Sequence, residues 1–106
     1  GQLNASGPVN VNGRFQINSG GWATGTGVWK YGPTAALEFN TNDFYGVNSD
    51  AVFWPVTDGP INVHILQGGL LLNTPRTVTG IFQTSAGVKN TYGNDLTASG
   101  TVRLKA

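Results

Sequence analysis

Alternation of apolar and polar residues is the feature that most constrains how this chain folds. The segment 9–17 places four apolar residues on one side of an extended chain: Val9, Val11, Phe15 and Ile17. A repeat of two residues is typical of strands with one buried face. Gly or Pro interrupts nearly every window with helical spacing, so no helix is expected. Asn12-Gly13 lies inside this run and is interpreted as either a hairpin turn or a glycine bulge.

Seven further segments have the alternation or the β-branched and aromatic composition of strands. They are Gly27–Tyr31, Ala35–Asn40, Ala51–Val56, Ile61–Leu66, Leu70–Leu72, Thr77–Gln83 and Gly100–Lys105. Turn-forming clusters separate them at intervals of about 8 to 12 residues, which is the spacing of sandwiches and barrels. Because no repeat of fixed period is visible, a solenoid is not expected. The sequence therefore predicts an all-β fold, an antiparallel β-sandwich of about seven to eight short strands.

The composition indicates how such strands would be protected from aggregation. Only 10% of the residues are charged, and there is no Cys, whereas soluble domains usually carry about a quarter charged residues. A chain this neutral needs another way to shield its strand edges, and no disulfide is available to stabilise it. Burial of the edges between subunits meets both needs, so an oligomer is expected.

Charge and hydropathy exclude two classes of partner. The six basic residues are scattered along the chain, whereas a duplex-binding surface needs clustered Lys and Arg. No nucleic-acid partner is therefore expected. The longest clearly apolar run, Gly69–Leu72, is far too short to span a bilayer, so no membrane insertion is expected.

Residues for catalysis and for metal binding are sparse. The single histidine, His64, lies in an alternating segment and is interpreted as a strand residue that is either exposed or satisfied by hydrogen bonds. Glu38 alternates with apolar residues and is expected to face solvent. The other acids lie in turn-like segments, where Asp stabilises the turn itself: Asp43, Asp50, Asp58 and Asp95. With one His and no Cys, zinc is not expected. We therefore predict a protein that is not an enzyme, with no catalytic residue, no metal and no cofactor.

Aromatic residues are the remaining candidates for binding. Trp29 and Trp54 are interpreted as core or interface residues, because aromatic side chains dominate such burial. Trp22 follows two glycines, and Phe44-Tyr45 lie in an Asn-rich loop. An exposed ring beside amide groups suits a sugar, whose apolar face stacks on the ring while amides bind its hydroxyls. The candidate receptor-binding residues are Trp22, Asn42, Phe44 and Tyr45.

The stretch Gly1–Val11, with its alternating apolar residues and its Gly7-Pro8 turn, resembles the last repeat of a trimeric virus fibre shaft of the adenovirus type. The rest of the chain is similar to a compact, Cys-free β head, as in fibre heads and phage tail-fibre tips. The resemblance implies a shaft-like segment at residues 1–13 and a head at residues 14–106. It also implies a homotrimer at the virion surface whose outer loops bind a host-cell receptor, either a glycan or a protein.

The predicted function is thus non-catalytic attachment to a host cell by a viral fibre head. Two alternatives share the composition: a bacterial fimbrial or surface adhesin subunit, and a carbohydrate-binding module of a secreted enzyme. These would place the protein on a bacterial cell surface or in the extracellular space. A small hydrolase is a further alternative. The sequence has no acyl-transfer motif, which argues against a hydrolase.

Overall fold

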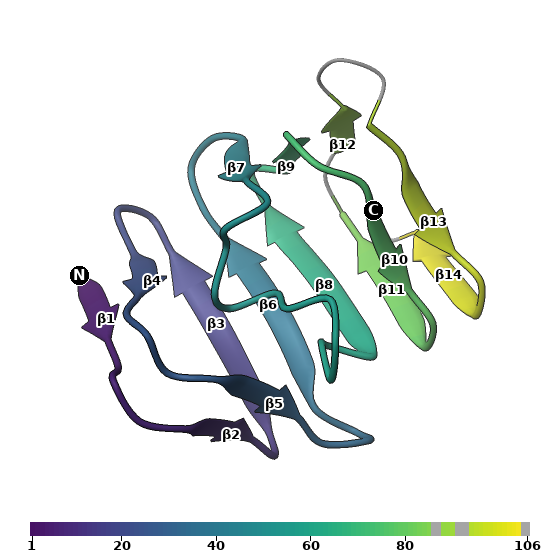
Figure 1. The fold of residues 1–106 in the computed structure, drawn as a ribbon. Coiled ribbons are helices and arrows are strands. Elements are labelled where there is room, and N and C mark those ends of the chain that lie inside the picture. Colours follow the sequence, from purple (N-terminus) through teal and green to yellow (C-terminus); the bar gives the residue numbers. More distant parts are fainter. Residues whose placement is uncertain (86–87, 91–93, 105–106) are drawn as a thin grey trace.

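A computed structural model describes residues 1–85, 88–90 and 94–104 of the chain, which form fourteen short β-strands (Figure 1). The strands are β1 (Gln2–Asn4), β2 (Val9–Val11), β3 (Arg14–Asn18), β4 (Trp22–Thr24), β5 (Trp29–Tyr31), β6 (Ala36–Asn40), β7 (Tyr45–Val47), β8 (Asn62–Gln67), β9 (Leu70–Leu72), β10 (Arg76–Val78), β11 (Ile81–Thr84), β12 (Val88–Asn90), β13 (Leu96–Ala98) and β14 (Thr101–Leu104). Nowhere in these ranges is there a helix that could cross a membrane.

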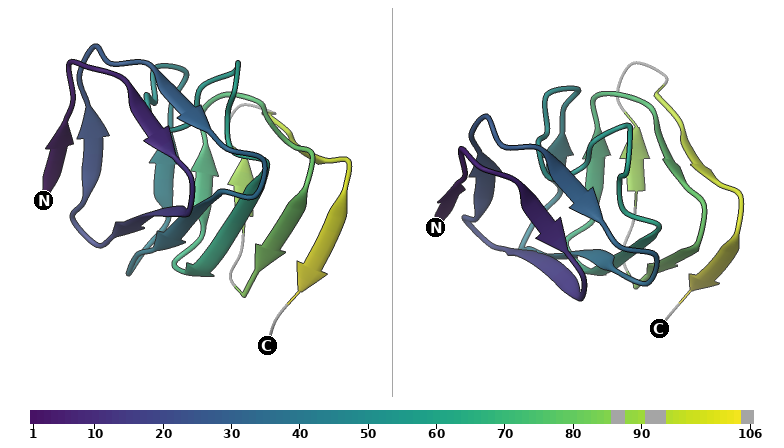
Figure 2. Two further views of the ribbon diagram at one scale, coloured as in Figure 1. Left: turned by 90° about the horizontal axis from the view of Figure 1, so that it is seen from below. Right: turned by 60° about the horizontal axis from the view of Figure 1, so that its bottom comes forward.

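The predicted antiparallel sandwich is wrong, because every strand pairing is parallel. The chain is a parallel β-solenoid, in which successive coils stack and each strand pairs with the equivalent strand of the next coil (Figure 2). The first coil contains β1, β2 and β3, and the second contains β4, β5 and β6. The third contains β7 and β8, the fourth β9, β10 and β11, and the fifth β12, β13 and β14.

The coils build three faces. The first face contains β1 paired with β4, and separately β9 paired with β7 on one side and β12 on the other. The second contains β2 paired with β5, and separately β10 paired with β13. The third is one sheet in the order β14, β11, β8, β6 and β3, whose strands run side by side in Figure 1. Only the third face is therefore continuous from the first coil to the fifth.

The spacing between coils explains why the repeat is hidden in the sequence. Paired residues lie 18 positions apart at Leu70 and Val88, but 26 positions apart at Ala36 and Asn62. A solenoid tolerates such variation because extra residues bulge out at corners while the strands keep their pairing. A search for one fixed period finds nothing in a chain of this kind, and the prediction against a solenoid was wrong for that reason.

Alternation correctly identified which residues face inward. Ile17, Leu37, Phe39, Val63 and Ile65 have at most 2% of their surface exposed and form the core together with Trp29. These buried side chains form continuous rows across the strands, because parallel pairing aligns Ile17 with Phe39, and Phe39 with Ile65. Alternation therefore gave the inward sides of the predicted strands, but it missed β1, β4, β7, β12 and β13 and did not show which strands are neighbours.

Three predicted elements differ from those observed. Residues 51–56 are not a strand but part of a loop, residues 48–61, which takes the place of a second-face strand in the third coil and is called the coil-3 loop here. The segment Thr77–Gln83 is divided by a corner into β10 and β11. Asn12-Gly13 is a corner between β2 and β3, which do not pair with each other. The predicted strand Gly100–Lys105 corresponds to β14, and Lys105 lies outside the described residues.

Residues 1–13 take part in the stacking. β1 pairs with β4, and β2 pairs with β5. The division into a shaft-like segment at 1–13 and a head at 14–106 stays a prediction, as does the homotrimer.

Candidate functional site

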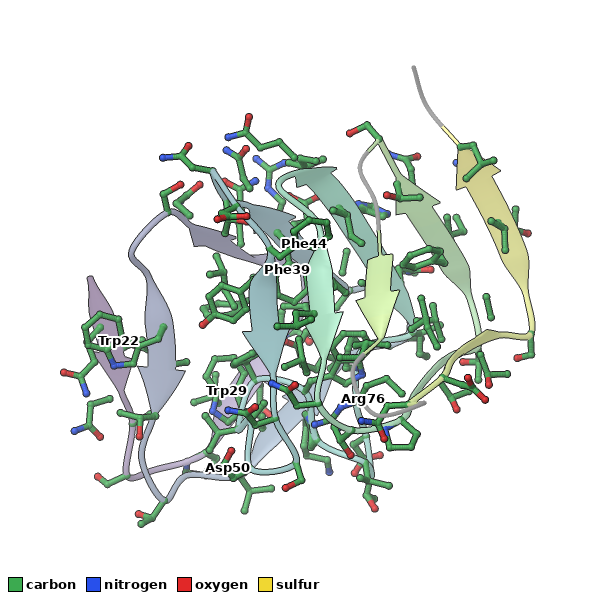
Figure 3. The ribbon with its side chains drawn as sticks, turned by 90° about the horizontal axis from the view of Figure 1, so that it is seen from above. Trp22, Trp29, Phe39, Phe44, Asp50 and Arg76 are labelled. Carbon is green, nitrogen blue, oxygen red and sulfur yellow. The ribbon has the colours of Figure 1, made fainter. Side chains whose placement is uncertain are left out.

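A hollow of about 280 Å³ opens on the first face, at the break between β4 and β7. Its wall on one side is β4 with Trp22, and on the other side it is β7 and the start of the coil-3 loop. Trp22 is 50% exposed and projects at the N-terminal end of the stack, whereas Trp29 lies inside (Figure 3). We call this space the Trp22 hollow. It arises because the two coils pair on the third face but separate on the first.

The Trp22 hollow combines aromatic and polar groups. Its polar lining comes from Gln2, Thr24, Tyr45, Asn48 and Asp50. Asp50 is the one charged side chain among the residues that line it. A flat ring beside amide, hydroxyl and carboxylate groups is the combination that binds a small polyhydroxylated ligand. The volume is close to the lower limit for ligand pockets, about 300 Å³, which suits a single sugar unit.

Tyr45 connects this hollow to a second, smaller one. Its ring packs on Phe39 and Phe53 at centroid distances of 5.6 and 6.0 Å, and its hydroxyl donates to the Gly21 carbonyl oxygen at 3.2 Å. Burial raises the pKa of this hydroxyl. The second hollow, of about 210 Å³, is lined by Tyr45 together with Asn42 and Phe44. The four residues named from the sequence thus lie around two adjoining hollows, with Tyr45 shared between them.

Arg76 holds the coil-3 loop that forms one wall of the Trp22 hollow. This side chain is 6% exposed, and its Nη2 donates to the Asn48 carbonyl oxygen at 2.8 Å while Nη1 donates to that of Trp54 at 2.6 Å. The guanidinium also lies over the Trp54 ring at 5.5 Å. Desolvation by burial lowers the pKa of Arg76. A cation from the fourth coil therefore fixes the loop of the third.

Several contributors could not be found from sequence. Gln2, Asn48 and Asp50 gave no signal beyond a polar composition, because only the stacking of coils brings residues 2, 22 and 48 together. Asp50 was interpreted as a turn residue, yet its segment lines the hollow. Arg76 gave no signal either, since a buried arginine is indistinguishable in sequence from an exposed one.

A separate polar cluster lies on the third face. Glu38 Oε2 lies 3.0 Å from His64 Nδ1, and Gln16 Nε2 donates to Glu38 Oε1 at 2.9 Å. The interpretation of His64 as a satisfied strand histidine is confirmed by this contact. Glu38 faces outward as predicted, but it is 6% exposed rather than solvated, because its neighbours on the adjacent strands cover it.

Within the described residues, no group of three or more His, Asp or Glu side chains is placed to hold a metal ion. Comparison with known proteins adds no relative: no family model, no curated protein and no solved structure matches the chain.

Proposed function

We propose that this protein binds a neutral glycan in the Trp22 hollow, without catalysis, and thereby attaches to a glycan-bearing surface. The observation that carries the proposal is the half-exposed Trp22 ring at a hollow whose other walls present amide, hydroxyl and carboxylate groups. Stacking of the apolar sugar face on such a ring removes apolar surface from water, while the polar groups select hydroxyl positions. Asp50 is the charged group in this lining, and it would repel acidic sugars.

Glycan-array binding followed by titration tests the proposal. Wild-type protein is expected to retain neutral glycans, and Trp22→Ala is expected to weaken binding at least tenfold, since the ring is the largest apolar surface of the hollow. Val56→Ala is the control, because Val56 is 94% exposed and lies outside the hollow. Retention of full affinity by Trp22→Ala would show that the Trp22 hollow is not the glycan-binding site. Absence of wild-type binding to any neutral glycan would contradict the proposed function.

Fluorescence gives a direct reading of the same site. Trp29 and Trp54 are each 2% exposed, so aqueous quenchers should reach Trp22 selectively. A bound glycan is expected to protect this fluorescence from iodide. Unchanged quenching at saturating glycan would mean that the ligand sits elsewhere.

Attachment by a homotrimer at a virion surface is the specific form of this proposal. A hollow near the lower size limit for pockets should bind weakly by itself, and three copies on one particle would raise the avidity. Light scattering after size exclusion is expected to give the mass of three chains. A mass of one chain would contradict the trimer and leave the hollow to be judged by the binding assays.

A further inference from the structure

The third face carries one continuous line of outward polar side chains. Its members come from five neighbouring strands: Gln16, Glu38, His64, Gln83 and Arg103. Strand pairing places each beside the next, since Gln16 is in register with Glu38, Glu38 with His64, His64 with Gln83, and Gln83 with Arg103. We call this line the third-face row. With neighbouring strands about 4.8 Å apart, it extends roughly 19 Å across the coils.

The first half of the row is held rigidly. Glu38 accepts a hydrogen bond from Gln16 and contacts His64 Nδ1, and its side chain is 8% exposed. Burial of a carboxylate is costly unless it is paired and hydrogen-bonded, so these contacts orient all three side chains. His64 Nδ1 is turned to Glu38, and the side chain of His64 is 23% exposed. The row is thus organised before any ligand arrives.

The accessible charge on this face is positive. The side chain of Arg14, next to the row on β3, is 70% exposed and lies 3.7 Å from Glu38 Oε1. Arg103, at the other end of the row, is exposed. The one carboxylate between them is buried and already engaged, whereas Arg14 and Arg103 remain accessible. This face therefore attracts anions, in contrast to the Trp22 hollow.

We propose that the third-face row binds an acidic polysaccharide that lies across the strands, with successive sugar units over successive coils. Amide, imidazole and guanidinium groups donate and accept hydrogen bonds along the whole line, and the two arginines meet carboxylate or sulfate groups near its ends. No Phe, Tyr or Trp side chain belongs to the row, so affinity depends on hydrogen bonds and charge. The row lies on the third face and the Trp22 hollow opens on the first, so the proposal does not rest on the function of the hollow.

Affinity electrophoresis and calorimetry with the intact chain test this site, using polygalacturonate and heparin as acidic probes and dextran as the neutral one. We expect retardation by the acidic probes at low salt, weakening as salt rises. Arg103→Gln is expected to weaken binding roughly tenfold, the loss of one charge-assisted hydrogen bond. Lys30→Gln is the matched control, because Lys30 is an exposed cation on β5 of the second face.

Glu38→Gln separates a binding role from a structural one. It removes the one negative charge of the row, and its amide oxygen can still accept a hydrogen bond from Gln16, so acidic probes should bind more tightly than to wild type. Trp22→Ala should leave their binding unchanged. Far-UV circular dichroism and the thermal midpoint establish that each variant is folded.

Four outcomes would overturn the proposal. Wild-type protein that binds neither acidic probe at low salt has no such site. Equal weakening by Arg103→Gln and Lys30→Gln would mean binding through net charge alone. Weakening by folded Glu38→Gln would contradict the charge argument. Tighter binding of single-stranded RNA than of both polysaccharides would assign the row to nucleic acid.

Discussion

At the residue scale, two hydrogen bonds from Arg76 take the place of a missing strand pairing. Where the third coil lacks a second-face strand, its loop has no ladder partner on β10, and the guanidinium binds two loop carbonyls instead. Hydrogen bonds to charged donors contribute about 1.5 to 3 kcal/mol each. This side chain therefore supports the coil-3 loop, together with Tyr31, whose hydroxyl and backbone N–H also donate to loop carbonyls.

We predict that Arg76→Ala lowers the free energy of unfolding by about 2 to 4 kcal/mol, because the buried Trp54 carbonyl and the part-buried Asn48 carbonyl lose their donor. Arg14→Ala, which removes a side chain that is 70% exposed, should cost at most about 1 kcal/mol. Urea denaturation followed by circular dichroism measures both. Equal midpoints for the two variants would contradict the role given to Arg76.

Tyr31 makes the free energy of unfolding depend on pH in the alkaline range. Its hydroxyl donates to the Phe53 carbonyl oxygen at 2.6 Å, and burial raises its pKa. Below pH of about 10, the ordinary tyrosine pKa, the hydroxyl is protonated in both the folded and the unfolded chain. Above that pH the unfolded chain loses the proton first, so stability falls as pH rises toward the raised pKa of the folded state.

Tyr31→Phe should cost about 1 kcal/mol at neutral pH, the net value of the lost hydrogen bond. The same variant should lose less stability than wild type between pH of about 8 and about 11. Urea midpoints across this range measure the difference. Parallel curves for wild type and variant would show that another group controls alkaline unfolding.

At the scale of the elements, glycines at the corners allow neighbouring coils to approach each other closely. A Cβ at Gly27, which lies before β5, would collide with the carbonyl oxygen of Gly7 in the coil beneath. Gly7 itself has nothing within 4 Å of the equivalent position. One coil therefore needs glycine at this corner, while its neighbour does not.

Gly27→Ala should destabilise the fold by about 1 to 3 kcal/mol, because backbone must move to accommodate the methyl group. Gly7→Ala should change stability by less than about 1 kcal/mol. Thermal unfolding of the pair gives the comparison. A tolerated alanine at residue 27 would mean that the corner adjusts freely.

Elements also show where prediction from sequence succeeded and failed. Leu70–Leu72 was predicted with its observed bounds, and the inward sides of residues 9–17 and 35–40 were correct, because alternation is a local property. Parallel pairing was missed because alternation says nothing about which strand is the neighbour. Residues 51–56 have the composition of a buried strand, but Phe53 and Trp54 reach the core from a loop. Trp22 and Tyr45, named from the sequence as candidate receptor-binding residues, line the Trp22 hollow, whereas its wall at 48–50 depended on the stacking.

The whole molecule is a linear array in which each coil contacts its neighbours. Stability in such arrays is a sum of coil and interface terms, so it differs along the stack. β1 and β14 consist entirely of exposed residues, whereas β6 is almost fully buried.

We predict that amide hydrogen exchange is slowest in β6 and β8 and faster by orders of magnitude in β1 and β14, because the outer strands open without disturbing the centre. Exchange followed by mass spectrometry of peptides covering each coil measures this gradient. Uniform protection from β1 to β14 would show instead that the stack unfolds as one cooperative unit.

The variable spacing between coils has an evolutionary consequence. The third coil absorbs extra residues in its loop while the pairing of β6 with β8, and of β8 with β11, is maintained. Duplication of a coil that has all three strands would therefore add a strand to every face and disturb no existing partner. Each such duplication would lengthen the third-face row by about 4.8 Å, so the reach of this surface along a polymer can grow by gene-segment duplication in steps of one coil.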